Sequence, residues 1–434
     1  MTKTSSWGLL PSLNSEVELA NPTGPTDAFK VFEGRKFIPI GARRSYGDVG
    51  LNPGGSALST ENLDKFISFD ADSGQLECEA GVLIREIQST FVSHGWISPV
   101  TPGTSYVTVA GAIANDVHGK NHHTRGSFGN HVLEIVLARS DGSVVTCSEK
   151  TNKELFAATI GGLGLTGVIL SAKIQLSKVL SGWVKREKIS FNNLEEFFRI
   201  SKESEAGFES SVAWFDCSTD KAGRGSFIRG NHIATNNGSP EAPKTFLDLT
   251  FTPPMAIVNR ATLNPLNTAY FQLQKLTAGE RIESMWSFYY PLDSIRNWNR
   301  AYGPRGFYQY QSVIPTGNAE SVTGEMVERI SRSGLGSFLA VLKTFGDIPS
   351  KGLLSFPMEG TTLALDFPNL GEKTEKLFKE LDGLVLQAGG RLNPSKDARM
   401  TSEMFAAGYP MHREFTRFRD DALSSGFSRR VFGS

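Results

Sequence analysis

The sequence of 434 residues lacks several features that identify large classes of proteins. Its 45 basic and 45 acidic residues cancel, so no excess positive charge points to a nucleic-acid partner. Cys78, Cys147 and Cys217 are widely spaced without a CxxC pair, which is typical of a reducing compartment rather than of a disulfide framework. No run approaches the roughly 20 apolar residues of a membrane-spanning helix, and the N-terminus has no secretory pattern. We expect a cytoplasmic protein that can still contact a membrane surface.

Glycine, by contrast, is plentiful. The chain holds 44 glycines, which are densest before residue 170, and its hydrophobic content of 39% provides enough core for two domains. Three stretches carry most of the early glycines: "PIGARRSYGDVGLNPGG" (39–55), "GAIANDVHGKNHHTRGSFGNH" (111–131) and "TIGGLGLTGVIL" (159–170). In such stretches the backbone either turns tightly or lies close to a ligand.

The hydrophobic pattern predicts short strands and a few helices. Residues 131–149 predict two strands joined at the turn dipeptide Asp141-Gly142. Further strands are predicted at 167–176, 211–216, 285–293, 306–315 and 362–368, and helices at 82–95, 193–204 and 319–334. Residues 251–266 have a Pro-Pro pair and no clear period, so we predict a loop or lid there.

The stretch Gly162-Leu-Gly164-Leu-Thr-Gly167 matches G-x-G-x-x-G, the dinucleotide fingerprint. That fingerprint requires a strand before the glycines and a helix after them. Here the preceding residues look helical and the following ones look like a strand, which argues against a Rossmann site. Two readings stay open: a turn that permits tight packing, or a loop that lies against a ligand.

Four of the seven histidines lie within one of these stretches. His118 and His122 have the i, i+4 spacing of a zinc site, but that spacing works only on a helix, and Gly119, Gly126 and Gly129 disfavour one. The alternatives are histidines satisfied by local hydrogen bonds, or a cradle of backbone N–H groups around a large cofactor. The loop "RRSYGD" (43–48) is either a surface turn or part of the same cofactor bed.

Taken together, "RRSYGD", "PVTPGTSYVTVAGAIANDVHGKNHHTRGSFGNHV" and "ELFAATIGGLGLTGVI" resemble the FAD-binding oxidases of the vanillyl-alcohol oxidase type. More narrowly they resemble the subfamily that oxidises decaprenylphosphoryl-β-D-ribose, and the similarity continues through "FYYPLDSIRNWNRAYGPRGFYQYQSVIPTG" and "GGRLNPSKDARMTSEMF". The resemblance implies an α+β fold of two domains: an FAD-binding domain at 1–185, an inserted antiparallel-sheet substrate domain at 186–387, and a C-terminal return to the FAD-binding domain at 388–434.

The resemblance also implies site residues. Noncovalently held FAD would lie against Arg44, Ser45, Tyr46, Gly47, Asp48, Thr101, Pro102, Gly103, Thr104, Gly111, Ala112, Asn115, His118, Gly119, Asn121, His122, Gly164, Gly167 and Val168. The sugar-phosphate site would comprise Tyr289, Trp298, Arg300, Gln309, Gln311, Lys343, Thr362, Ala364 and Lys396. Lysine and arginine suit a phosphate diester, and carboxamides suit ribose hydroxyls. In mycobacterial members a cysteine and an asparagine stand where this chain has Ala364 and Thr362, so covalent capture of an inhibitor is not expected here.

The activity that the resemblance implies is oxidation of the ribose 2-hydroxyl of a polyprenyl-phosphoryl-β-D-ribose, with hydride passing to the flavin. Lys396, Tyr46 and His118 are the candidates to assist the proton. An NAD(P)H-dependent keto-reductase would complete the epimerisation to an arabinose donor for a cell-wall glycan, and a quinone or oxygen would reoxidise the flavin. No metal is implied. Two alternatives stay open: a soluble aldose, alditol or aldonolactone oxidase on the same fold, and a non-catalytic flavin or nucleotide binder.

Overall fold

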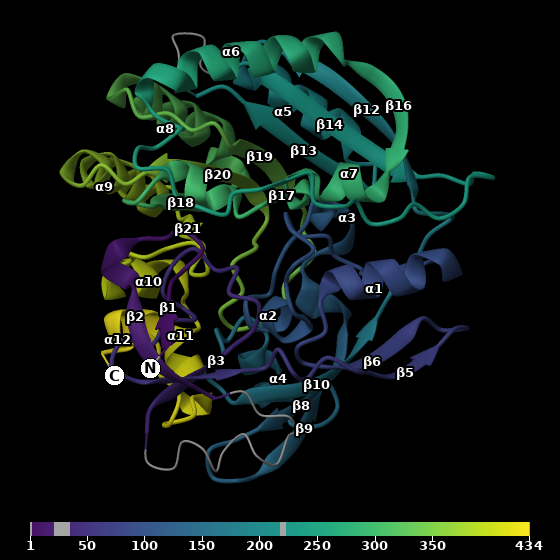
Figure 1. Ribbon diagram of the computed structural model, residues 1–434, viewed down its shortest axis with the longest axis vertical. Coiled ribbons are helices and arrows are strands. Elements are labelled where there is room, and N and C mark those ends of the chain that lie inside the picture. Colours follow the sequence, from purple (N-terminus) through teal and green to yellow (C-terminus); the bar gives the residue numbers. More distant parts are fainter. Residues whose placement is uncertain (1, 21–34, 218–222, 434) are drawn as a thin grey trace.

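The structure is a computed structural model, and it describes residues 2–20, 35–217 and 223–433. In Figure 1 the early strands and the last helices share the lower half of the molecule, and one broad sheet with its helices forms the upper half. Both ends of the chain therefore lie in the same half, and the middle of the sequence supplies the other. The mixture of helices with mainly antiparallel sheets confirms the predicted α+β class.

The lower half contains two main sheets among the described residues. The first has the order β1 (Thr2–Thr4), β2 (Ser15–Ala20), β4 (Ser56–Ser59), β3 (Phe37–Ile40), and the second the order β5 (Phe66–Asp70), β6 (Gln75–Glu79), β10 (Val168–Gln175), β8 (Val132–Ala138), β9 (Val144–Ser148). A short pair joins β7 (Trp96–Ile97) to β11 (Ser177–Lys178). The helices are α1 (Ile84–Phe91), α2 (Val109–Ala114), α3 (His122–Arg125), α4 (Lys153–Thr159), α10 (Ser402–Gly408), α11 (His412–Phe415) and α12 (Gly426–Phe432).

Local sequence explains several of these elements. The predicted hairpin is confirmed as β8 and β9, and Gly142 takes the positive φ of 85° that the turn requires. The predicted strand at 167–176 is confirmed as β10, whose alternate residues are buried between β6 and β8. The predicted helix at 82–95 is confirmed as α1, which buries Ile84, Ile87 and Phe91 on one face.

The upper half is built on one eight-stranded sheet. Its order is β16 (Gly279–Ser284), β12 (Trp183–Phe191), β14 (Gly225–His232), β13 (Ser210–Phe215), β19 (Ala340–Phe345), β20 (Gly360–Pro368), β18 (Phe307–Pro315), β21 (Arg391–Leu392), and each neighbouring pair is antiparallel. The predicted strands at 211–216, 306–315 and 362–368 are confirmed as β13, β18 and β20. Strand β21 comes from beyond residue 387, so the large sheet draws on the last segment of the chain too; the domain boundaries themselves stay a prediction.

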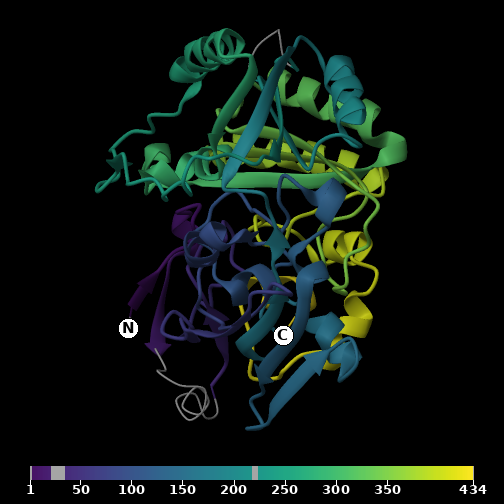
Figure 2. The same cartoon turned by 90° about the vertical axis from the view of Figure 1, so that its right-hand side faces the viewer.

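Helices cover both faces of this large sheet. One face packs against α5 (Leu194–Ser204), α8 (Ala319–Ser333) and α9 (Glu372–Gln387), and α5 places Phe197 beside Phe191 of β12. The other face carries α6 (Arg260–Leu276), whose Tyr270 packs edge-on against Trp214 of β13 at 4.8 Å between ring centroids. Figure 2 shows α6 on one flank of the sheet and α5 and α8 on the other. The face beneath α6 is the one that continues into the space between the two halves.

The prediction of a strand at 285–293 is wrong. This segment forms α7 (Met285–Tyr289) and a 3₁₀ turn at Pro291–Ser294. The Ser284 side chain accepts a hydrogen bond from the Trp286 N–H and so caps the helix. Buried residues occur on every side of the segment, so its pattern has no period that distinguishes helix from strand; they are Met285, Trp286, Phe288, Tyr289 and Tyr290.

The prediction of a loop at 251–266 is correct only in its first part. Residues up to Asn259 form no helix or strand, but α6 begins at Arg260, where the Asn259 side chain accepts hydrogen bonds from the N–H groups of Ala261 and Thr262. Pro265 lies inside the helix, where its ring would normally disrupt the ladder. Packing of Leu263 and Phe271 against the sheet stabilises the helix nonetheless.

Candidate active site

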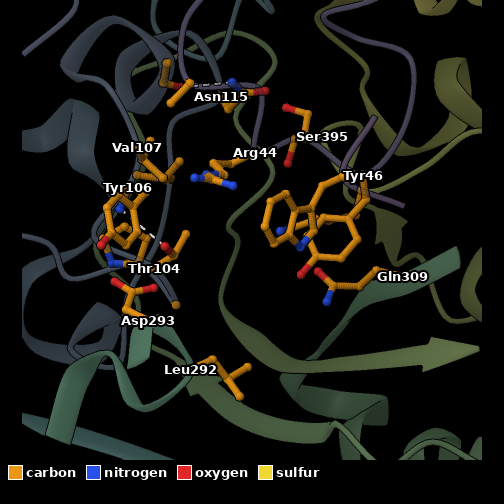
Figure 3. Close-up of a pocket in the computed structure, with 18 of the residues that line it drawn as sticks. Arg44, Tyr46, Thr104, Tyr106, Val107, Asn115, Leu292, Asp293, Gln309 and Ser395 are labelled. Atoms are coloured by element: carbon orange, nitrogen blue, oxygen red, sulfur yellow. Dashed lines mark hydrogen bonds between the residues drawn. The ribbon is translucent and has the colours of Figure 1, made fainter. Parts of the chain in front are cut away.

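A cavity of about 1110 Å³ lies between the two halves of the molecule. Its wall combines the three glycine-rich stretches, the large sheet and the C-terminal segment around Lys396. In Figure 3, Tyr46 and Gln309 stand on one wall, Tyr106, Thr104 and Asp293 on the opposite one, and Arg44 extends between them. Ligand pockets usually measure about 300 to 1,000 Å³, so this cavity has room for a ligand larger than a simple sugar.

Most of the residues named from the sequence meet at this cavity. Its lining includes Arg44, Ser45, Tyr46, Gly47, Thr101, Pro102, Gly103, Thr104, Gly111, Asn115, His118, Gly164 and Gly167, and from the upper half Tyr289, Trp298, Gln309, Gln311, Lys343, Ala364 and Lys396. The others lie elsewhere among the described residues: Asp48, Ala112, Gly119, Asn121, His122, Val168, Arg300 and Thr362. Arg300 lines a neighbouring pocket instead, and its guanidinium donates to the carbonyl oxygens of Leu249 and Thr250.

The "RRSYGD" loop is fixed by the C-terminal segment. The Tyr46 N–H donates to the Ser395 carbonyl at 3.0 Å, and a Cβ on Gly47 would lie 1.6 Å from the Asp397 carbonyl oxygen. Only glycine therefore allows the two backbones to approach this closely. Asp48 points away from the cavity and accepts a hydrogen bond from Arg430 at 2.6 Å, so this carboxylate ties the loop to α12.

The glycine turn at 161–167 is preceded by helix α4 and followed by strand β10, as the sequence predicts. Gly167 has a φ of 152°, and a Cβ there would lie 2.6 Å from the Leu137 side chain. The turn thus packs tightly against β8 while Gly164 reaches the cavity wall. This order of elements is opposite to that of a dinucleotide fingerprint.

The histidine-rich stretch is organised by a buried carboxylate. Asp116 accepts hydrogen bonds from the Ser127 hydroxyl at 2.8 Å and the Gly129 N–H at 2.7 Å, which folds the stretch back on itself. His122 is 1% exposed and packs against Phe345, and burial lowers its pKa to about 3. Within the described ranges, no group of three or more His, Cys, Asp and Glu side chains is placed to hold a metal ion.

A chain of hydrogen bonds fixes His118 at the cavity wall. The Ser395 backbone N–H donates to Asn393 Oδ1 at 3.0 Å, which orients the Asn393 amide so that its Nδ2 donates to Gln311 Oε1 at 3.0 Å. Gln311 Nε2 must then donate to His118 Nε2 at 3.0 Å. The ring therefore carries its proton on Nδ1, and burial, with the nearby Lys343 charge, holds its pKa well below the usual value. His118 is a neutral, oriented ring.

Three lysines line the upper part of the cavity: Lys120, Lys343 and Lys396. Burial, together with the charge of Lys396, lowers the pKa of Lys343 to about 7. Burial likewise lowers the pKa of Lys120 to about 7, with Lys343 adding repulsion. Lys120 also donates to the carbonyl oxygens of Phe288 and Tyr289, which holds its ammonium in place. We call these three side chains the lysine row.

Lys396 has the most distinctive surroundings of the row. Its ammonium lies 4.1 Å from the centroid of the Tyr46 ring, and burial lowers its pKa to about 8, against the opposing charge of Asp366. Asp366 is fully buried and accepts a hydrogen bond from Gln309 at 2.7 Å, and burial raises its pKa to about 7. Burial, with the Asp366 charge, raises the pKa of Tyr46 well above its usual value, so this phenol keeps its proton.

The site contains residues that the sequence did not single out. Asp293 accepts hydrogen bonds from the Ser105 N–H at 2.7 Å and the Ser105 hydroxyl at 2.6 Å, and its charge opposes the lowering of the Arg44 pKa by burial. Lys120 lies within the quoted histidine-rich stretch, and Asn393 within the quoted C-terminal one, so the motifs contained them without marking their roles. Asp293 likewise lies within a quoted stretch, "FYYPLDSIRNWN…", but its role depends on its contact with Ser105 across the two halves, which no motif indicates.

The lower part of the cavity suits a large polar ligand. Arg44 Nε, Thr101 Oγ1 and Asn115 Oδ1 are buried polar atoms without a hydrogen-bond partner in the part of the chain that the structure describes. Such atoms are costly unless a ligand or water satisfies them. A Cβ on Gly103 would meet nothing within 4 Å, so the backbone there is open to close approach. These groups, on the glycine-rich side of the wall, fit a dinucleotide.

Comparison with known proteins also indicates a flavin dinucleotide site. A family model described as FAD binding domain matches residues 28–148. The chain is 37% identical over 417 residues to decaprenylphosphoryl-beta-D-ribose oxidase of Mycolicibacterium smegmatis, covering 92% of this chain and 89% of that protein. Shorter matches, about a third of each chain, link it to L-gulonolactone oxidase of Mus musculus (28% identical; 33% of this chain, 32% of that one) and to D-lactate dehydrogenase of Archaeoglobus fulgidus (31% identical; 33% and 34%). The chain belongs to the family of FAD-dependent oxidoreductases, with a vanillyl-alcohol-oxidase-type fold, that act on CH–OH groups.

Proposed function

We propose that the protein oxidises the 2-hydroxyl of a polyprenyl-phosphoryl-β-D-ribose to the 2-keto sugar, using noncovalently bound FAD. The observation that carries this proposal is the lysine row, which lies beside Gln309 and Gln311 in the same cavity. A row of half-buried lysines matches a phosphodiester, and carboxamides match ribose hydroxyls. The extensive identity to decaprenylphosphoryl-beta-D-ribose oxidase supports the same substrate class.

The proposed roles of the residues follow from their positions in the cavity. Arg44, Thr101 and Asn115 would hold the flavin dinucleotide, whose chemistry is to accept the hydride from the sugar carbon. Lys120 and Lys343 would hold the phosphodiester and so orient the ribose. His118 accepts a hydrogen bond at Nε2 from Gln311, so its role would be to orient the bound groups rather than to take the proton.

Lys396 is the best placed group to accept the hydroxyl proton. With a pKa of about 8, its amine is partly neutral near neutral pH, whereas the Tyr46 phenol is not ionised there. Lys396 contacts the Tyr46 ring, so removal of the proton by Lys396 would leave the resulting ammonium over an aromatic face. Ala364 lines the same cavity and offers no thiol for covalent capture.

Anaerobic mixing tests this proposal. Farnesyl-phosphoryl-β-D-ribose should bleach the oxidised flavin absorbance, and the product should carry a 2-keto group that borohydride reduces to a mixture of ribose and arabinose. Precipitation with acid should release the yellow colour into the supernatant. Bleaching by free ribose or by an aldonolactone, and not by the phosphodiester, would instead identify a sugar or lactone oxidase, which the partial similarity to L-gulonolactone oxidase keeps as the second candidate.

Two partners follow from this chemistry. The keto sugar would need an NAD(P)H-dependent reductase to become the arabinose epimer, for a cell-wall or other arabinose-containing glycan. The reduced flavin would need a quinone or oxygen. Adding each acceptor to the bleached protein and following the return of absorbance would identify the faster one.

A further inference from the structure

Exposed apolar side chains concentrate in one part of the molecule. More than half of the exposed large apolar residues in the described part of the chain fall within residues 246–282. They include Phe246, Leu276 and Met255, which are 87%, 84% and 76% exposed. The full set is Phe246, Leu247, Phe251, Met255, Ile257, Leu266, Leu273, Leu276 and Ile282, and we call it the apolar rim. A concentration of this kind marks an interaction surface, whereas single exposed apolar residues do not.

Helix α6 shows that the rim is not a by-product of packing. Leu263, Asn267, Phe271 and Gln274 form its buried stripe against the sheet. A second, exposed stripe follows at Leu266, Ala269, Leu273 and Leu276, with the i, i+3, i+7 spacing of one helix face. A surface helix needs only one apolar stripe to pack on its own domain. The second stripe is exposed, so it packs against no other part of the described chain.

The same segment is almost without charge. Arg260 is the only charged residue between Leu249 and Gln274, although 21% of the chain is charged. The exposed charged residues nearest to this stretch are Lys244 and Asp248 before it and Lys275 after it. A charge-poor apolar surface with a lysine on each side matches the lipid–water interface, where apolar groups enter the acyl region and lysines reach the headgroups.

The rim borders an opening of the cavity. Asp248 and Arg296 line the cavity and are themselves exposed, so the cavity reaches the surface beside the short strands β15 (Leu247–Asp248) and β17 (Ile295–Arg296). Tyr270 and Gln274, on the face of α6 next to the exposed stripe, also line the cavity. Figures 1 and 2 show α6 and the chain that precedes it on the same flank of the large sheet.

We propose that the apolar rim docks onto a lipid bilayer and places the cavity opening at the membrane surface. A polyprenyl-linked substrate would then enter the site from the membrane while its chain stays out of water. This inference rests on the proposed function for its purpose, but docking itself is a property of the rim. Among the described residues, no helix combines the length and the apolar character that a membrane span requires.

Flotation of the FAD-loaded protein with vesicles of phosphatidylcholine and a minority of phosphatidylglycerol tests the docking. The double variants Leu273→Ser/Leu276→Ser and Phe246→Ser/Met255→Ser should bind vesicles at least about tenfold more weakly, because apolar burial supplies the affinity. The matched control Leu180→Ser/Leu386→Ser removes exposed apolar residues outside the rim and should float like the unaltered protein. Docking through the rim is overturned if the unaltered protein does not float, if the rim variants float equally well, or if the protein instead self-associates through the rim.

Activity separates this inference from the proposed function. All four proteins should oxidise dissolved farnesyl-phosphoryl-β-D-ribose at the same rate, because the rim residues changed here do not line the cavity. With a decaprenyl substrate embedded in vesicles, only the two rim variants should slow, by about the factor lost in binding. If no protein oxidises the farnesyl compound, the proposed function fails while flotation still decides the docking. If the rim variants oxidise the embedded substrate at the unaltered rate, the role of docking in substrate entry is wrong.

Discussion

The lysine row predicts that phosphodiester ligands bind more weakly as the pH rises above 7. Burial lowers the pKa values of Lys120 and Lys343 to about 7, well below the usual value for lysine. An anion bound between them favours the charged forms and raises both pKa values again. The complex is therefore protonated over a range where the free protein is not. The affinity should be full below pH 7 and decrease as the pH rises through the pKa of the free protein.

The size of the effect follows from these pKa values. If one lysine with a pKa near 7 must be protonated for binding, raising the pH from 7 to 9 weakens binding about 50-fold. If both must be protonated and they titrate independently, the loss approaches about 2,500-fold. A phosphodiester keeps a single negative charge throughout this range, so the ligand itself contributes no pH dependence.

Farnesyl-phosphoryl-2-deoxyribose is a suitable ligand because it has no 2-hydroxyl to oxidise. Its dissociation constant can be followed between pH 6 and pH 9 from the change in flavin absorbance of the FAD-loaded protein. Lys343→Met should weaken binding at pH 6 and remove one lysine's share of the pH dependence. Lys373→Met, on the exposed surface of α9, is the matched control and should change neither. A dissociation constant of the unaltered protein that stays within about twofold from pH 6 to pH 9 would refute the role of the row.

Three further predictions concern other residues of the site. Lys396→Met should load FAD normally yet slow flavin reduction by about 100-fold or more, measured by stopped-flow absorbance; full turnover in this variant would show that another group takes the proton. Gly47→Ala should lower the melting temperature of the protein, because the added Cβ would lie 1.6 Å from the Asp397 carbonyl oxygen. Gly103→Ala should leave the melting temperature of the FAD-free protein unchanged and weaken FAD binding, because its Cβ enters open cavity. Equal effects of the two substitutions on the melting temperature would contradict this difference in packing. Gln311→Leu leaves His118 and Asn393 without their shared partner and should cost about 1–3 kcal/mol of unfolding free energy in chemical denaturation, and a loss near zero would contradict the network.

Local patterns predicted the parts of the fold that depend on local rules. The hairpin around Asp141-Gly142 is specified by a turn dipeptide and alternation on both sides, so neighbouring residues suffice to predict it. For the segment at 285–293 the neighbouring residues do not suffice, because its aromatic residues are buried on every side by contacts from both halves of the molecule. Helix α6 was missed because its two apolar stripes and Pro265 together conceal the helical period.

The site was predictable to the extent that motifs contain it. The stretches around Tyr46, Thr101 and His118 are contiguous motifs, and the structure brings their residues to one cavity. The lysine row is different, because Lys120, Lys343 and Lys396 belong to three distant segments and each alone resembles a surface lysine. Lys343 comes from β19 and Lys396 from the chain after β21, and the backbone of Lys120 is held at β13 by the Ser211 N–H, which donates to the Lys120 carbonyl oxygen at 2.9 Å. Asp48 shows the converse: a polar residue inside a cofactor motif that serves to hold α12.

The lysine row also bears on stability, with a sign opposite to that of a salt bridge. A lysine whose pKa is lower in the folded chain than in the unfolded one destabilises the fold at pH 7, and this penalty declines as the pH rises from about 7 toward the unfolded value. The ligand-free protein is therefore less stable than the packing of its side chains alone would make it. An anion bound between the lysines of the row restores this stability, so ligand binding and folding are linked. A site that is unfavourable when empty and favourable with a phosphodiester is what selection for binding, rather than for stability, produces.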